Sequence, residues 1–328
     1  MQASTRRSLV LAGTTVVLIA TSFSHAQSFP SKPIRLIVPF PPGGVDITIR
    51  LIQNQMSEDL GQPIVLENRG GANGFIGSEL VAKAAPDGHT ILATTSSTLI
   101  AGPLVSANTP FDPIKDFTPI TMVYLTISAL GAKASLPVNS VRELVDYAKK
   151  NPGKLSYGSS GIGSAQHLDG ETFKLVAGTD IVHIPYKGGG PQAQGLVSGE
   201  IDVSFQPLQQ LRPFMSGGKI KLLAFYNGPR PADLTNLPDL ADAQSGFKAG
   251  PGFIGLLGPA KMPAPVLARL NSAAVKAITA PDTRAKLEAN GAIIVAGTPE
   301  SFAADLKSGL EGTRKYVEAL KARGIKFE

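Results

Sequence analysis

A loop of small and rigid residues follows the first predicted strand and leads directly into a predicted helix. It covers residues 39–46 and contains Pro41, Pro42, Gly43, Gly44 and Asp46. Glycine leaves the backbone bare, and proline fixes φ, so little ordering entropy is lost on binding. The amides of a helix N-terminus attract anions, and Asp46 is placed to cap that helix. The loop predicts an anion site, with a ligand-free strand-to-helix turn as the alternative.

A second loop, "SYGSSGIGSAQH" at residues 156–167, repeats the arrangement in the other half of the chain. Three glycines clear space for a ligand, and serine hydroxyls add donors beside the backbone amides. Ser164 is the expected N-cap of the next helix. The candidate ligand contacts in this loop are Ser159, Ser160, Gly163, Ser164 and His167. Two such loops, each opening a separate unit, favour one shared site for a small organic anion.

Catalytic and metal-binding patterns fit the sequence poorly. The string Gly158–Gly161 is not the G-x-S-x-G nucleophile elbow, and Ser164, His167 and Asp169 on one helix do not aim a base at a nucleophile. The histidines show no ligand spacing, no phosphate-binding P-loop or dinucleotide motif occurs, and cysteine is absent. We therefore expect no catalytic residue, no metal and no cofactor.

The elements that must position these loops alternate between strand and helix. Strands are expected at residues 34–40, 64–67 and 90–94, with helices at 47–60 and 75–84, which favours a parallel sheet covered on both faces. Residues 117–132 are apolar without helical periodicity and are interpreted as a connection between domains. A second α/β series follows, residues 251–259 could cross back, and the C-terminal part is mostly helical. We expect two α/β domains with a cleft between them, formed by residues 27–125 with 250–328 and by residues 126–249.

The first 26 residues have the pattern of a secretory signal peptide. Arg6 and Arg7 precede an apolar segment at residues 9–20, which is too short to span a bilayer, and cleavage is expected after Ala26. The formal charge of the whole chain is +6, and loss of the leader lowers it by two. That modest, diffuse charge suits a small anion rather than nucleic acid. The mature chain is expected to be periplasmic and not embedded in the membrane.

Several stretches together resemble the Bug-type extracytoplasmic solute receptors, the binding subunits of tripartite tricarboxylate transporters. They include "PSKPIRLIVPFPPGG", "GQPIVLENRGGANGFIG", "YGSSGIGSAQHL" and "HIPYKGGGPQAQGLVSGEIDVSF", in order and with long spacing preserved. The resemblance covers essentially the whole mature chain. It implies a two-domain periplasmic binding protein of the Venus-flytrap, type II-like kind, which is a monomer that passes its solute to an inner-membrane permease.

The resemblance also places further residues at the site. It implies a first clamp at residues 40–46, which includes Phe40, and a second at residues 159–167. Hydroxyls of Thr95 and Ser96, the loop with Lys187 and Gly188, and Gln206 would complete the pocket. Two departures from the family pattern bear on the ligand: one residue fewer separates the glycine pair from Asp46, and Gln206 stands where aspartate is frequent.

Some assignments stay open on the sequence alone. Lys187 could face the cleft as a cation or be a solvated loop lysine, and Tyr186 could line the pocket or pack beneath a strand. Phe40, Pro41 and Pro42 could form an apolar wall for an aromatic ligand. For function, the leading hypothesis is a receptor for a di- or tricarboxylate or an aromatic acid. The alternatives are a ligand sensor for a signalling partner and an exported enzyme acting on a small acid.

Overall fold

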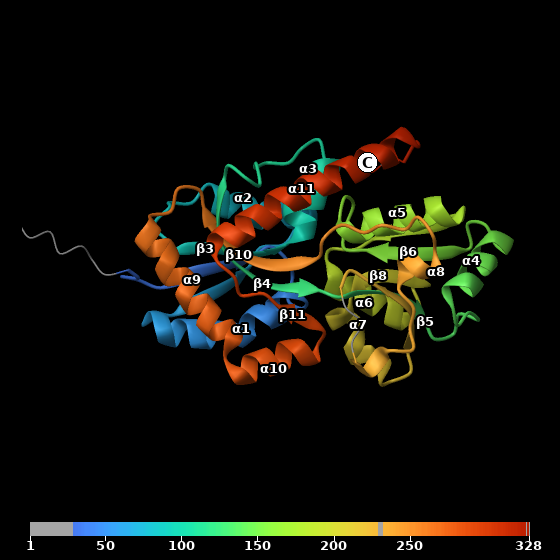
Figure 1. Ribbon diagram of the computed structural model, residues 1–328, viewed down its shortest axis with the longest axis horizontal. Helices are drawn as coiled ribbons and strands as arrows, with labels where there is room; N and C mark the ends of the chain where they lie inside the picture. Colours follow the sequence, from blue (N-terminus) through green and yellow to red (C-terminus); the bar gives the residue numbers. More distant parts are fainter. Residues whose placement is uncertain (1–28, 229–231, 326, 328) are drawn as a thin grey trace, which may run out of the picture.

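The computed structural model describes residues 29–228, 232–325 and 327. The predicted signal peptide, residues 1–26, lies outside these residues. The described chain forms two β-sheets, each covered by helices on both faces, and the two units lie side by side along the long axis (Figure 1). This is the α/β, two-unit architecture that the alternation of strands and helices predicts.

The first sheet has six strands in a mixed arrangement. Their spatial order is β11 (Ala292–Ile294), β4 (Phe117–Thr126), β10 (Phe253–Pro259), β3 (Thr90–Thr95), β1 (Ile34–Val38) and β2 (Ile64–Asn68). Strands β1, β2 and β3 are parallel, but β10 runs antiparallel to both β3 and β4. The expectation of parallel strands is therefore confirmed for the three strands on which it rests, whereas the whole sheet is mixed, because β10 enters it after the chain has visited the second unit.

Helices cover both faces of the first sheet. They are α1 (Val45–Leu60), α2 (Phe75–Ala82), α3 (Gly102–Val105), α9 (Ala264–Thr279), α10 (Pro281–Ala289) and α11 (Pro299–Ala322), with short helical turns η1 (Ala72–Gly74) and η2 (Ser97–Ala101). The apolar stripes of α1 and α9 bury one face, with Ile49 and Ala273 fully buried, while α2 and α11 bury the other around Phe302. Two apolar faces explain why the central strands are hydrophobic throughout.

The second sheet has five strands. Their order is β7 (Ile181–Pro185), β6 (Leu155–Ser159), β8 (Val203–Pro207), β5 (Ser128–Lys133) and β9 (Ile220–Tyr226). Strand β6 is parallel to β7 and β8, whereas β5 is antiparallel to β8 and β9, so this sheet is mixed as well. In both sheets the strands that carry the predicted loops, β1 and β6, lie within the parallel part.

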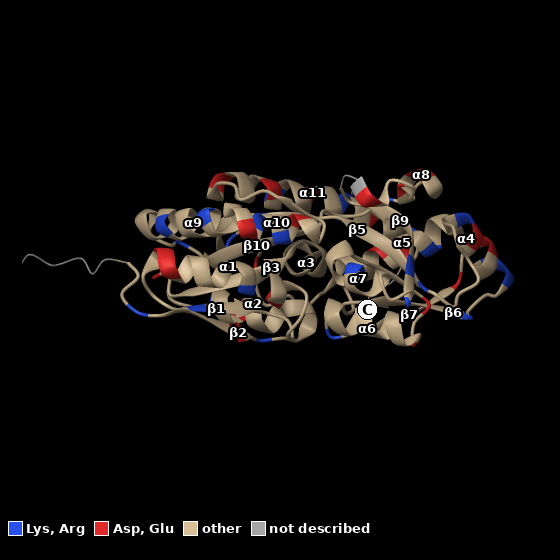
Figure 2. Cartoon of the chain, turned by 90° about the horizontal axis from the view of Figure 1, so that it is seen from below, with Lys and Arg blue, Asp and Glu red and all other residues tan. Residues whose placement is uncertain are grey.

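The helices of the second unit also occupy both faces of its sheet. They are α4 (Val141–Lys150), α5 (Ala165–Ala177), α6 (Gly189–Ser198), α7 (Leu208–Met215) and α8 (Leu240–Ala243), with the turn η3 (Ala232–Leu234). Phe173 of α5 is buried in one core and Leu211 of α7 in the other. Helix α7 is absent from the sequence-based expectation. Lysines and arginines are interspersed with acids over outer helices such as α4 and α10 (Figure 2).

The chain passes between the two sheets at residues 126–128. Strand β4 ends at Thr126 in the first sheet and β5 begins at Ser128 in the second, with Ile127 alone between them. The expected connection at residues 117–132 is confirmed as a passage between units, although it consists of two strands. The return passage ends in β10, as the apolar run at residues 251–259 suggests.

The end of the C-terminal helix is buried against the second unit. Val317 and Leu320 of α11 form an apolar cluster with Val105 of α3 and Leu168 of α5, and Phe327 joins it. Figure 1 shows α11 running from the first unit toward α5. Among the described residues, no helix is both long and apolar enough to span a bilayer.

Candidate functional site

A cavity of about 640 Å³ lies between the two sheets. Both of its walls include loops that the sequence singles out. Nine of the predicted contacts line it: Phe40, Pro41, Pro42, Gly43, Gly44, Thr95, Ser96, Ser160 and Gly188. The volume fits a small-molecule ligand.

The loop after β1 forms one wall of this cavity. Gly43 has φ 114° and Gly44 has φ 51°, both in the region that favours glycine. A Cβ on Gly43 would lie 3.9 Å from the Cα of Gly190, so the two loops come close across the cleft. Helix α1 begins at Val45, and Gly44 supplies no side-chain cap to its first amides.

Asp46 does not cap α1 and does not line the cavity, so the capping prediction is wrong. Its carboxylate accepts hydrogen bonds from the guanidinium of Arg50, one turn along the helix, at 2.9 and 3.2 Å. This is an ordinary pair between positions i and i+4 of a helix. Asp46 therefore neutralises Arg50 and leaves the first-turn amides to other partners.

The loop after β6 contributes one face to the cavity and has a second role as a link between the units. Ser160 lines the cavity, and Ser164 caps α5 as predicted, its Oγ accepting from the amide of His167 at 3.2 Å. The amide of Ala165, the residue after Ser164, donates to Oγ of Ser97 at 3.0 Å. Because Ser97 follows β3, this hydrogen bond joins the two units at the edge of the cavity.

Two predicted residues belong to a neighbouring cavity of about 480 Å³. Lys187 and Gly163 line that smaller cavity, which shares Phe40, Ser160 and Gly188 with the larger one. A Cβ on Gly163 would meet Val105 of the first unit at 2.7 Å, so this position has little room for a side chain. Tyr186 lines the smaller cavity as well.

Gln206 lies behind the loop that it is expected to complete. Its side chain is fully buried, and its Nε2 donates to the carbonyl of Gly189 at 2.8 Å. Gly189 and Gly190 line the larger cavity, while Gln206 does not. Its contact therefore fixes the shape of the Gly188–Gly190 loop from the protein side.

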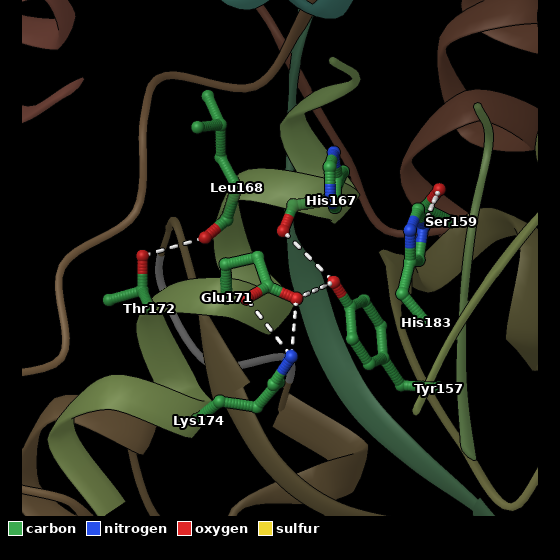
Figure 3. Close-up of polar contacts among 8 residues, drawn as sticks. All are labelled: Tyr157, Ser159, His167, Leu168, Glu171, Thr172, Lys174 and His183. Atoms are coloured by element: carbon green, nitrogen blue, oxygen red, sulfur yellow. Dashed lines mark hydrogen bonds and ion pairs between the residues drawn. The ribbon is translucent and has the colours of Figure 1, made fainter. Parts of the chain in front are cut away.

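His167 and Ser159 also lie behind the cavity wall, in a cluster of rings beneath the second loop (Figure 3). The imidazoles of His167 and His183 stack with centroids 4.0 Å apart and planes 8° from parallel. Ser159 Oγ lies 2.7 Å from Nε2 of His183, and the Gly163 amide donates to Nδ1 of His167 at 3.1 Å. Burial lowers the pKa of each histidine to about 4, so both rings are neutral at pH 7.

The sequence analysis did not identify several polar groups of the cavity. Thr126 and Ser128 lie on either side of Ile127, Tyr226 ends β9, and Gln210 lies on α7, which was not expected. Asp169 was weighed only as a catalytic partner, yet the residue lines the cavity. Asp169 lies one turn into the helix that follows the second predicted anion loop. That position could have marked it as a candidate cavity residue.

Two polar side chains in the cavity wall lack partners among the described residues. The hydroxyl of Thr95 and both amide atoms of Gln209 are buried without a hydrogen bond. Such groups are costly unless something satisfies them. Within the described residues, no group of three or more histidines and acids is placed to hold a metal ion.

Comparison with known proteins adds the family. A family model described as "Tripartite tricarboxylate transporter family receptor" matches residues 48–308. The protein BugT of Bordetella pertussis is 32% identical over 278 residues, which is 84% of this chain and 85% of BugT.

Two solved structures with the same fold contain a small organic acid. An R. palustris protein solved with adipate has a TM-score of 0.85 and 31% identity, over 89% of this chain and 98% of that one. MatC from Rhodopseudomonas palustris, solved with bound malate, has a TM-score of 0.82 and 28% identity, over 88% and 99% of the two chains. The chain therefore belongs to the receptor family of tripartite tricarboxylate transporters, the Bug-type periplasmic solute-binding proteins.

Proposed function

We propose that this protein is a receptor that captures a small organic carboxylate in the larger cavity and delivers it to the permease of a tripartite tricarboxylate transporter. In this proposal residues 27–125 and 250–328 form one domain and residues 126–249 the other. The cavity lies between them, and their closure traps the ligand. The receptor is exported through cleavage after Ala26, works in the periplasm as a monomer and catalyses no reaction.

The observation that carries the proposal is the composition of the cavity wall. Among its described residues there is no lysine or arginine, whereas glycines from both units line it and the start of α1 has no side-chain cap. Backbone amides at such positions bind carboxylates through hydrogen bonds and the helix dipole. The unpartnered hydroxyl of Thr95 and amide of Gln209 supply further polar groups.

The ligands of the relatives point to the same class of solute. Adipate and malate are dicarboxylates, and each was found with a family member that shares this fold. The apolar part of the wall, with Phe40, Pro41 and Pro42, suits the carbon skeleton between or beside the acid groups. The permease partner is proposed from the family to which the chain belongs.

A thermal-shift panel tests the proposal. The mature chain is heated with acetate, succinate, malate, adipate, citrate and benzoate, each at millimolar concentration, and at least one acid is expected to raise the melting temperature by several degrees. Chromatography of the same mixtures is expected to show each acid unchanged. A panel without any shift, or formation of a product, would count against a carboxylate receptor.

A matched pair of glycine variants locates the binding site. Gly43→Leu places a side chain between the two loops of the cavity and is expected to abolish the shift. Gly61→Leu is the control, because Gly61 also has positive φ, ends the same helix and has open space around it. Both variants carry backbone strain, but only Gly43→Leu should lose the ligand-induced shift.

A further inference from the structure

Asp169 is the only lysine, arginine, aspartate or glutamate among the described residues that line the larger cavity. It lies on α5, one turn beyond the Ser164 cap, and only 4% of its surface is exposed. A carboxylate in this position would face a carboxylate ligand with no basic side chain in the wall to offset the repulsion. Its protonation state therefore decides what the cavity accepts.

Burial, rather than the groups packed around Asp169, stabilises its neutral form. The hydroxyl of Tyr226 on β9 hydrogen-bonds its carboxyl, and Tyr316 on α11 and Tyr157 on β6 are close enough for its charge to act on them. No cation of the described residues acts on it. On its own helix Lys174 pairs with Glu171 at 2.8 Å, and His167 is neutral.

Burial raises the pKa of the Asp169 carboxyl to about 8, and the hydrogen bond from Tyr226 offsets only part of that rise. At neutral pH the group therefore carries a proton and is a hydrogen-bond donor. Burial and the Asp169 charge hold the pKa of Tyr226 well above its ordinary value, so that ring does not compete in the same pH range.

The two protonation states make opposite contributions to binding a carboxylate. Two negative charges in contact inside a buried cavity repel strongly, because the low dielectric there screens them poorly. A protonated carboxyl instead donates a short O–H···O⁻ hydrogen bond, which is stronger than a bond between neutral groups. Binding of an anion therefore favours the protonated form.

We propose that Asp169 is a specificity-determining residue, which donates a hydrogen bond from its protonated carboxyl to a carboxylate of the ligand and so couples binding to the uptake of a proton. This inference rests on the proposed function, since it concerns the same cavity. Asp169 would select ligands that carry a hydrogen-bond acceptor at its position in the cavity. It would also make ligand affinity fall in alkaline solution.

Calorimetric titration between pH 6 and pH 9.5 tests this proposal, with succinate, malate, adipate, citrate and benzoate as probes. For an acid that binds at pH 6, affinity is expected to be level up to about pH 7 and to fall about tenfold per pH unit above pH 8. Repeating the titration at pH 8.5 in buffers of different ionisation enthalpy is expected to show uptake of most of one proton per ligand.

Two variants separate Asp169 from other titrating groups. Asp169→Asn keeps a neutral donor of similar shape, so the pH dependence above pH 8 and the proton uptake are both expected to vanish. Glu171→Gln is the control, since Glu171 is a buried carboxyl two residues away that pairs with Lys174 outside the cavity. This variant should keep the profile of the original protein.

The outcomes distinguish this inference from the function on which it rests. Binding that stays equally tight to pH 9.5, or that takes up no proton, overturns the role of Asp169 and leaves the receptor function intact. If none of the five acids binds at any pH, the proposed function fails too. The measurements on the unaltered protein decide the matter even if Asp169→Asn does not fold.

Discussion

The hydrogen bond from the Ala165 amide to Ser97 Oγ is a contact of single residues with consequences for the cleft. Ser97 follows the end of β3 in the first unit, and Ala165 is the first residue of α5 in the second. Both line the larger cavity. The bond is available only while the two units are close together, so it favours the arrangement that encloses a ligand.

Replacing Ser97 by alanine is expected to speed ligand release. The lost hydrogen bond is worth about 1 kcal/mol, or roughly a fivefold faster dissociation, which stopped-flow displacement of a bound dicarboxylate would measure. Ser57→Ala is the control, because Ser57 Oγ accepts the Ile64 amide at 3.0 Å entirely within the first unit. That variant should lower stability and leave the release rate unchanged. Equal release rates for the two variants would contradict a linking role for Ser97.

Single residues differ in how well the sequence predicts their place. The resemblance placed Thr95 and Ser96 at the site, and both line the cavity at the end of β3. The resemblance also placed Gln206 there, whereas the residue is buried in β8 behind the loop that contains Gly189. Asp169 was missed as a cavity residue because its environment comes from strands and helices far away in the sequence.

At the scale of elements, the stacked histidines tie α5 to β7. His167 comes from the helix and His183 from the strand, and each holds a group of the second loop through a hydrogen bond (Figure 3). His167 can accept from the Gly163 amide only while its Nδ1 is unprotonated. The loop geometry therefore depends on the His167 ring staying neutral.

Acid is expected to destabilise this part of the fold. The pKa of each histidine is near 4 in the folded protein and about 6.5 when unfolded, so the unfolded chain binds more protons between those values. Stability is complete above pH 6.5 and falls as the pH drops toward 4, by about 3 kcal/mol for His167 alone. Urea unfolding at pH 7.5 and pH 5 would measure this loss.

Variants test whether the stacked rings of His167 and His183 cause the loss of stability in acid. His183→Gln should make the pH dependence of unfolding shallower but not flat, because the glutamine does not titrate while His167 stays buried. His89→Gln removes a histidine of the first unit and should keep the slope. An unchanged slope in His183→Gln would mean that other groups cause the acid sensitivity.

Regular periodicity predicted most elements, and the exceptions have physical causes. Helix α7 carries Pro213 in its interior, which disguised it as a loop between two strands. Strands β4 and β5 were merged because Ile127 between them is buried and apolar, so no turn residue marks the boundary. Helix starts were predicted well where a side chain caps them, as Ser164 does, and wrongly at α1, where Gly44 offers none.

For the whole molecule, the end of α11 connects the units on the side away from the strand crossing. Leu320 is buried in a cluster that includes Leu168 of the second unit and Val105 of the first. Such a contact resists separation of the two units even without a ligand. The antiparallel direction of β10 was not predicted, since local pattern says nothing about the side from which a strand enters a sheet.

Truncating Leu320 is expected to loosen the ligand-free protein. Leu320→Ala should cost about 3 kcal/mol and increase the radius of gyration measured by small-angle X-ray scattering, because a contact shared by both units is lost. Leu306→Ala is the control on the same helix, since Leu306 packs only within the core of the first unit. It should lower the melting temperature similarly with no change in radius. An unchanged radius in both variants would argue against α11 as a restraint.

The strand crossing at Ile127 would be the hinge of any opening or closing movement of the two units. Thr126 and Ser128 flank that point and line the cavity, whereas Gly43 and Gly190 lie on loops that approach each other across the cleft. Displacement grows with distance from a hinge, so residues beside Ile127 would move little while more distant loops of the cavity would move further. A ligand long enough to reach from the hinge side of the cavity to its opening would limit how far the two units close. Its length would then set the angle between them.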